Sequence, residues 1–144
     1  MTTNPFSETE LRYLASQSHG RLATVGPAGE PQNRPVGFSV DPATGAIDIG
    51  GPKLAASRKF RNVAANPLVS LVVDDYAPEG STRSPFRGRG IEIRGRAEAR
   101  YDETPANPYF SGELIRIHPA RVITWNLDPD APGVEARDVP PAPR

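Results

Sequence analysis

The first apolar positions of the chain are spaced for a helix. "FSETELRYLASQSHG" opens with Ser7, and Glu10 follows three residues later. This is a capping-box pattern, in which the two side chains satisfy free N–H groups at a helix start. Leu11 and Leu14 are three residues apart and form one apolar face. The pattern predicts an amphipathic helix that Gly20 ends.

Alternating positions follow, and they predict strands. In "RLATVGPAGEPQNRPVGFSVDPATGAIDIGG", Val36, Phe38 and Val40 alternate with small or polar residues, and Ile47 and Ile49 alternate again. The intervening "GPAGEP" and "DPATG" are turn sequences. Period-two alternation punctuated by Gly and Pro is typical of hairpins and meanders. We therefore expect three strands here.

A second helix and further strands are predicted after this region. "PKLAASRKFRNVAANP" has near-helical apolar spacing, and Asn66-Pro67 ends it because proline disfavours α-helix at the residue before it. "LVSLVVDD" is a buried strand, and "IEIRGRAEAR" alternates like a strand with one wet face. "YAPEGSTRSPFRGRG" has loop composition, and "YDETPANPYFSGE" is irregular. "LIRIHPARVITWNL" is a final strand, bent or bulged at Pro119.

This order predicts a mainly β fold with a few helices. Short strands at such spacing favour a closed antiparallel barrel over a parallel sheet. We expect a single domain over residues 1–127 and a Pro-rich C-terminal tail over residues 128–144. The tail has few large apolar residues, so we expect it to be disordered or draped over the surface.

Composition excludes several function classes. Lys+Arg and Asp+Glu are both 17 among 144 residues, so no basic excess indicates a general nucleic-acid binder. The absence of cysteine excludes disulfides and thiolate metal sites, and the two histidines are far apart, so no metal site is predicted. No signal peptide or membrane span is evident, and we expect a cytoplasmic protein without membrane contact.

The "SRK" triplet, Ser57, Arg58 and Lys59, is the strongest candidate for chemistry. It lies at the start of the second predicted helix, where free N–H groups and the helix dipole favour an anion. The hydroxyl, the guanidinium and the ammonium could hold one phosphate group. Gly50-Gly51 just before them lets another group approach the backbone. The alternative is a solvated basic helix face, and spacing alone leaves both interpretations open.

Three weaker candidates also have structural alternatives. In "NRPVGF", Arg34 and Pro35 could present backbone groups to a ligand at a sheet edge, or simply form an edge strand. "RGRG" at residues 87–90 could meet a polyanion, but a flexible loop is favoured. Trp125 is expected in the core, or beside a flat cofactor. No catalytic residue can be named, because no nucleophile triad or Walker-type loop is present.

Taken together, "SRKFRNVAANPLVSLVV", "GRLATV", "EPQNRPVGF", "GAIDIGG", "RGIEIRGRAEA" and "IRIHPARVITWN" resemble the pyridoxamine 5'-phosphate oxidase-like superfamily of split β-barrel flavin-binding proteins. The resemblance covers about residues 7–127. "IDIGG", "ASRKFRNV" and "IHPARVITW" are similar to the actinobacterial deazaflavin-dependent branch, the F-420-dependent enzymes.

The resemblance implies an FMN-binding type of split barrel that forms a homodimer with the cofactor at the interface. The family's cofactor-binding segments correspond to ten residues: Arg34, Pro35, Val36, Gly37, Ile49, Gly50, Gly51, Ser57, Arg58 and Lys59. With the resemblance added, a phosphate site at the triplet is favoured over a solvated helix face.

Two departures from the family bear on function. A glutamine that helps to bind flavin mononucleotide (FMN) in the oxidase falls on Gly90, and the C-terminal segment for pyridoxal phosphate is missing. We therefore expect an oxidoreductase that uses coenzyme F-420 to transfer a hydride to a small unsaturated or aromatic substrate. The alternatives are an FMN-binding oxidoreductase of the same fold, or a non-catalytic carrier of a flat ligand.

Overall fold

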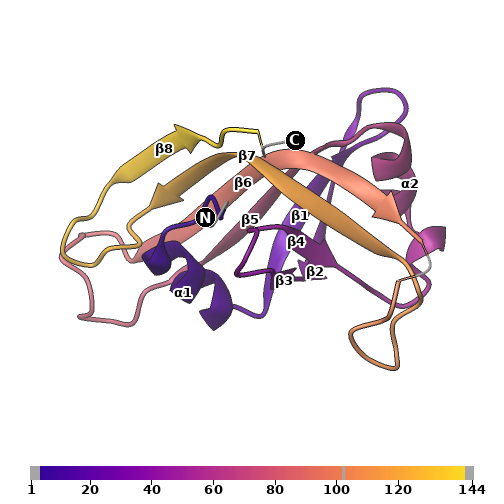
Figure 1. Cartoon of the computed structure of the whole chain (residues 1–144). Helices are drawn as coiled ribbons and strands as arrows, with labels where there is room; N and C mark the ends of the chain where they lie inside the picture. The colour runs from indigo at the N-terminus through magenta and orange to yellow at the C-terminus, as the bar shows by residue number, and fades with distance from the viewer. Residues whose placement is uncertain (1–3, 102, 142–144) are drawn as a thin grey trace.

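The computed structural model describes residues 4–101 and 103–141, which form a curled antiparallel sheet with short helices at its margins (Figure 1). In chain order the elements are α1 (Glu8–Ser16), β1 (His19–Val25), β2 (Pro31–Gly37), β3 (Ser39–Val40), β4 (Ile47–Ile49), the 3-10 helix η1 (Leu54–Ala56), α2 (Arg58–Ala65), β5 (Leu68–Tyr76), β6 (Gly88–Arg100), β7 (Leu114–Trp125) and β8 (Val134–Asp138). The predicted mainly β fold with few helices is confirmed.

The sheet has the strand order β2-β1-β5-β6-β7-β4-β3, and β8 pairs with β7. One edge of β7 pairs with β6 along its length. The other edge is shared, because β4 takes its first half and β8 its second half. Among the described residues β2 and β3 are not paired with each other, although only Phe38 separates them. The sheet therefore curls without closing, and the expected closed barrel is wrong, because the short β3 turns away to pair with β4.

The core lies inside this curl. α2 packs across β1 and β6 and closes one end. The largest fully buried aliphatic side chains come from β1, β4, η1 and the three long strands β5, β6 and β7. They are Leu22, Ile47, Ile49, Leu54, Leu71, Val73, Ile91, Ile93, Ile115, Ile117 and Val122. Each such side chain contributes about 1.5–3 kcal/mol by leaving water. Along β6 and β7 the buried isoleucines and the buried valine largely alternate with half-buried or exposed positions, as the period-two pattern predicts.

Helix α1 begins as predicted and ends earlier. Ser7 accepts a hydrogen bond from the backbone N–H of Glu10, and the Glu10 carboxylate accepts one from the backbone N–H of Ser7. The capping box is therefore confirmed. The helix stops at Ser16, not at Gly20, because Gly20 already belongs to β1 and pairs with Val36 of β2.

The predicted bend in the final strand is a β-bulge. Arg94 pairs with Arg121, but Gly95 pairs with Pro119, so Ala120 is an extra residue in β7. Proline has no N–H to donate to the ladder, and a bulge is where a strand interior tolerates it. The prediction of a bent or bulged strand at the proline is confirmed.

The "RGRG" segment is not a flexible loop. Strand β6 begins at Gly88, and the guanidinium of Arg89 donates two hydrogen bonds to Asp75, of 2.8 and 3.1 Å. The hydroxyl of Tyr13 donates a third to the same carboxylate. The hydrogen bonds from Arg89 hold the pKa of Asp75 below its ordinary value. Arg89 is therefore committed to the fold, since its fork is already satisfied by a carboxylate.

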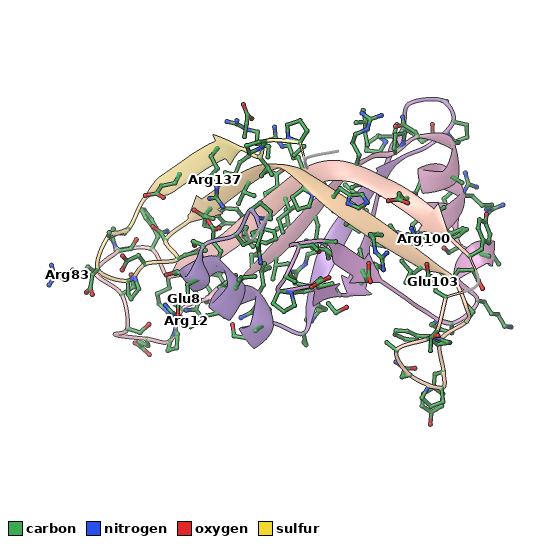
Figure 2. All side chains as sticks on the ribbon, in the orientation of Figure 1. Glu8, Arg12, Arg83, Arg100, Glu103 and Arg137 are labelled. Carbon is green, nitrogen blue, oxygen red and sulfur yellow. The ribbon has the colours of Figure 1, made fainter. Side chains whose placement is uncertain are left out.

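Part of the expected C-terminal tail is also ordered. Val134–Asp138 forms β8 on the outer edge of β7 and is mostly exposed, so of the two alternatives for the tail disorder is wrong for these residues. Figure 2 shows Arg137 reaching from β8 towards the N-terminal segment. Its guanidinium donates to both carboxylate oxygens of Glu10 and to the carbonyl of Pro5, at 2.6–2.8 Å. None of the helices in the described parts of the chain is long and apolar enough to span a membrane.

Candidate functional site

The segment that carries the predicted triplet is an irregular turn followed by a capped helix. Lys53 adopts a left-handed backbone conformation, with φ of 49°, and η1 follows it. Ser57 then caps α2: its hydroxyl accepts from the N–H of Phe60 and donates to the carbonyl of Leu54. Arg58 and Lys59 are consequently the first two residues of the helix, as the sequence predicts.

A cavity of about 400 Å³ opens between α2 and β2. Arg34 of β2 lies on one side, and Arg58 and Arg61 of α2 lie on the other. Arg58 and Arg61 share a helix face because they are three residues apart. The fold therefore brings together three guanidinium groups from two separate elements, and we refer to them with Lys59 as the basic site.

The basic site has excess positive charge. Burial, and then the charge of Arg34, lower the pKa of Lys59. Within the described residues, no carboxylate lies at ion-pair distance from the four cationic side chains of the basic site. Glu30 lines the cavity, but its carboxylate accepts a hydrogen bond from Ala28 N–H in its own turn. Clustered cations without a carboxylate partner favour an anionic ligand.

Buried hydrogen bonds fix the two walls of the basic site relative to each other. The amide of Asn62, on α2, donates to Thr24 of β1 at 3.0 Å and to Gln32 of β2 at 3.3 Å. Asn62 and Thr24 are almost completely buried. Because an unsatisfied buried amide is costly, this network holds α2 against the strand pair. The guanidinium groups are thereby carried on a rigid frame.

The structure separates the ten predicted residues into groups. Arg34 and Arg58 line the basic cavity, and Lys59 lies close enough to Arg34 to sense its charge. The Ser57 hydroxyl donates a hydrogen bond to the carbonyl of Leu54, so its proton is not available to a phosphate. Its contribution to the site is to cap the helix that carries Arg58 and Lys59. Pro35 is exposed on the edge strand β2.

The side chains of Val36 and Ile49 point into the core, with 7% and 0% exposure. Only their backbone groups could face a ligand. Gly37 and Gly50 line a second cavity of about 310 Å³, at the end of β2, three residues along the strand from Arg34. Gly51 is buried, and its carbonyl accepts hydrogen bonds from both the N–H and the hydroxyl of Ser111.

The group that approaches Gly50 closely is a side chain of the same protein, Phe110. A Cβ atom built on Gly50 would lie 2.6 Å from the Phe110 ring. The sequence predicted that these glycines admit a neighbouring group, and in the described part of the chain that neighbour is the loop at residues 103–113. Phe110, Arg61 and Asn62 were all missed by sequence reasoning. Arg61 was detectable, because it recurs three residues after Arg58 on the helix.

Gly90, the departure from the family pattern, has a structural cause. A Cβ atom there would lie 2.5 Å from the Trp125 ring and 2.7 Å from the Val73 carbonyl oxygen. Trp125 is partly buried and occupies the space next to this glycine. A glutamine side chain could not stand at this position without displacing the indole ring.

Comparison with known proteins shows the family of the chain. The family described as pyridoxamine 5'-phosphate oxidase matches residues 7–140. The chain belongs to this family. The match includes β8, so the family region extends into the segment predicted as a tail. The split β-barrel fold is thereby confirmed.

Individual relatives are similar over nearly the full chain. A 5a,11a-dehydrotetracycline/5a,11a-dehydrooxytetracycline reductase of Streptomyces rimosus is 45% identical over 137 residues, 94% of each chain. A conserved hypothetical protein of Mycobacterium tuberculosis superposes with a TM-score of 0.65 at 23% identity, over 88% of this chain and 89% of that chain. An FAD-binding protein of Mycobacterium smegmatis superposes with a TM-score of 0.59 at 18% identity, over 92% and 97%. The last two likenesses concern the fold alone.

Proposed function

We propose that the protein is an oxidoreductase that uses coenzyme F-420 to reduce a small unsaturated or aromatic substrate. The observation that carries this proposal is the basic site, in which Arg34, Arg58 and Arg61 face one cavity without carboxylate partners among the described residues. When bound, the reduced coenzyme supplies a hydride, so the chain needs no nucleophile of its own.

The residues present fit such a coenzyme. The basic site would hold its phosphate by charge-assisted hydrogen bonds. The second cavity, lined by Gly37 and Gly50, begins three residues further along β2 from Arg34. Three residues of a strand span about 10 Å. The edge of β2 beyond Arg34 would therefore orient the rest of the coenzyme through its backbone groups, and the second cavity would lie beside the bound coenzyme.

The named relative supports a reductase. The Streptomyces rimosus protein is a reductase of dehydrotetracyclines, and 45% identity over 94% of both chains makes a shared reaction class the simplest inference. We infer a small-molecule substrate with conjugated rings for this chain as well.

F-420 is favoured over FMN by the surroundings of Gly90. The glutamine expected in an FMN-binding member has no room beside Trp125. The first alternative is an FMN-binding oxidoreductase of the same fold. A carrier without turnover is the second alternative.

The coenzyme is tested by titrating the purified protein with F-420 and with FMN. We expect F-420 to bind and FMN to bind much more weakly. The double variant Arg58→Ala/Lys59→Ala should lose at least tenfold in F-420 affinity, because each charge-assisted hydrogen bond contributes about 1.5–3 kcal/mol. Arg12→Ala is the control, since Arg12 is an exposed arginine on α1 far from the basic site in the fold.

Tight FMN binding without F-420 binding would overturn the coenzyme assignment. Unchanged F-420 affinity in the double variant would make the triplet a solvated helix face after all. F-420 binding without reduction of any compound in a panel of quinones, enones and polycyclic phenols would favour the carrier.

We also propose a homodimer, as the family resemblance implies. An apolar groove of about 470 Å³ runs between β1 and β5, and Leu68 on its wall is 51% exposed. A second copy of the chain would cover this leucine and bring its own strands close to the basic site on the neighbouring β2 edge.

A further inference from the structure

We propose that the second cavity is the substrate subsite, that it selects a flat aromatic ring system without an anionic group, and that Phe110 is the specificity-determining residue that stacks on it. This proposal rests on the proposed function, because a substrate subsite presupposes a reaction, but ligand binding to the cavity can be tested without the coenzyme. Three features of the described residues support it: the aromatic lining, the charge of the rim and the fixed loop.

The second cavity is small, and two aromatic side chains line it. Phe38, between β2 and β3, and Phe110, in the loop at residues 103–113, both line the cavity, and both are partly exposed. Its volume of about 310 Å³ lies at the small end of ligand cavities, which run from roughly 300 to 1,000 Å³. It can hold one ring system but not a whole coenzyme. Aromatic rings pair with other flat rings by offset or edge-to-face contacts.

The rim carries only acidic charges. Asp48, Glu103 and Glu113 line this cavity, and none of its described lining residues is basic. Asp48 is paired with Arg116, and Glu103 with Arg100, but both cations lie outside the lining. The basic site, further back along β2, has the opposite charge. Because Asp48 and Glu103 are each neutralised by an arginine, the net charge of the rim rests on Glu113. An anionic group would therefore be drawn to the basic site and not to this cavity.

The loop that carries Phe110 is tied down at its base. Ser111 accepts a hydrogen bond from the N–H of Leu54 at 3.0 Å, and Glu113 accepts one from the N–H of Ala55 at 3.0 Å. These bonds satisfy the free N–H groups at the start of η1, which lacks a side-chain cap of its own. The loop is thus joined to the segment that leads into the basic site.

A second tie closes the loop on itself. The N–H of Glu103 donates to the carbonyl of Gly112 at 2.8 Å, and Figure 2 shows Arg100 and Glu103 together at this base. At the other margin the ring of Tyr101 meets Phe60 of α2 edge-on, with centroids 5.3 Å apart. Phe110 is therefore held in place before a ligand arrives, which lowers the entropy cost of stacking.

The test uses two flat fluorescent probes of similar size and opposite charge: proflavine, a cation, and an anthracene carboxylate, an anion. Titrated into the full chain without coenzyme, proflavine should bind and the carboxylate should bind at least tenfold more weakly. Phe110→Ala should weaken proflavine binding about threefold to tenfold, in line with the worth of an aromatic pair. Phe110→Leu, which keeps an apolar side chain of similar size, should lose a similar factor.

Two controls complete the design. Tyr109→Ala removes a neighbouring aromatic side chain that is 82% exposed, and it should leave both affinities unchanged. Glu113→Gln keeps an acceptor for Ala55 but removes one rim charge, so it should narrow the difference between the two probes.

Equal binding of the two probes, or proflavine affinity unchanged in both Phe110 variants, would overturn the subsite. These outcomes are distinct from failure of the proposed function, because F-420 affinity is measured separately. Phe110→Ala should leave F-420 affinity within twofold of the parent. Probe binding in a protein that does not bind F-420 would leave the subsite standing and remove the coenzyme assignment.

Discussion

Gly88 and Gly90 lie two residues apart on β6 and have opposite surroundings. No atom lies within 4 Å of a Cβ built on Gly88, whereas at Gly90 the Trp125 ring and the Val73 carbonyl are both closer than 3 Å. Packing therefore requires a glycine at Gly90 but not at Gly88. At Gly90 it makes room for an indole ring, and it thereby removes the side chain with which an FMN-binding member of the family would hold its cofactor.

Gly90→Ala should destabilise the protein by about 1–3 kcal/mol, because the added methyl group overpacks against a backbone oxygen and a ring. Gly88→Ala should leave stability within about 0.5 kcal/mol of the parent, as for surface substitutions without a structural role. Urea unfolding of both variants measures the difference. Equal stability of the two would show that Trp125 moves aside freely.

At the scale of elements, β8 and α1 are joined by one ion pair across the length of the chain. The carboxyl side chain of Glu10 is only 8% exposed, while that of Arg137 is 40% exposed. Burial raises the pKa of Glu10, but the hydrogen bonds from Arg137 and Ser7 outweigh it, and the pKa lies below its ordinary value of 4.5. The pair thus anchors the C-terminal strand to the first helix.

Arg137→Ala should cost about 1.5–3 kcal/mol, the range for hydrogen bonds to charged groups, because Glu10 stays buried without its partner. Arg121→Ala is a matched control on the same strand pair: Arg121 bonds to Asp138, which is 83% exposed. Exposed pairs contribute about 0–1 kcal/mol. Chemical unfolding at neutral pH should separate the two variants, and equal losses would contradict the anchoring role.

The pH dependence of this anchor has a definite sign. A carboxyl group whose pKa is lowered by folding stabilises the protein above its unfolded pKa, and that stabilisation is lost as pH falls through the folded value. The stability difference between the parent and Arg137→Ala should therefore be full at neutral pH and should shrink below pH 4.5. Unfolding curves over that range measure it. A difference that grows in acid would contradict the ion pair.

At the scale of the whole molecule, the curled sheet of the described residues ends in two edge strands, β2 and β3. β2 is one of these, and it carries Arg34 beside the arginines of α2. Because β3 turns to β4 instead of closing the ring, the β2 edge and the apolar groove around Leu68 remain open in a single copy. Open strand edges and exposed apolar grooves favour association.

We therefore expect a dimer in light scattering at micromolar concentration. Leu68→Glu should shift the mass towards the monomer, because it places a charge in the groove. Phe86→Glu should not, since Phe86 is 75% exposed on the loop between β5 and β6 and lies outside the groove. A monomeric parent protein would contradict the dimer. The basic site would then consist of residues of one chain alone.

The sequence by itself determined several local features of the fold and two residues of the basic site. The capping box at Ser7, the helix stop at Asn66 and the bulge at Pro119 depend on neighbouring residues, so local patterns reveal them. Arg58 and Lys59 were likewise recognisable at a helix start. Their motif also identified the family, from residues alone.

Only the tertiary structure decided which distant residues meet. It placed Arg34 and Arg61 around one cavity and packed the Phe110 ring against Gly50. It also formed the ion pairs of Arg89 with Asp75 and of Arg137 with Glu10. None of these contacts has a signal within a short window, because each depends on how strands far apart in the chain are aligned. Register and curl set those alignments, and they arise from the packing of the whole core.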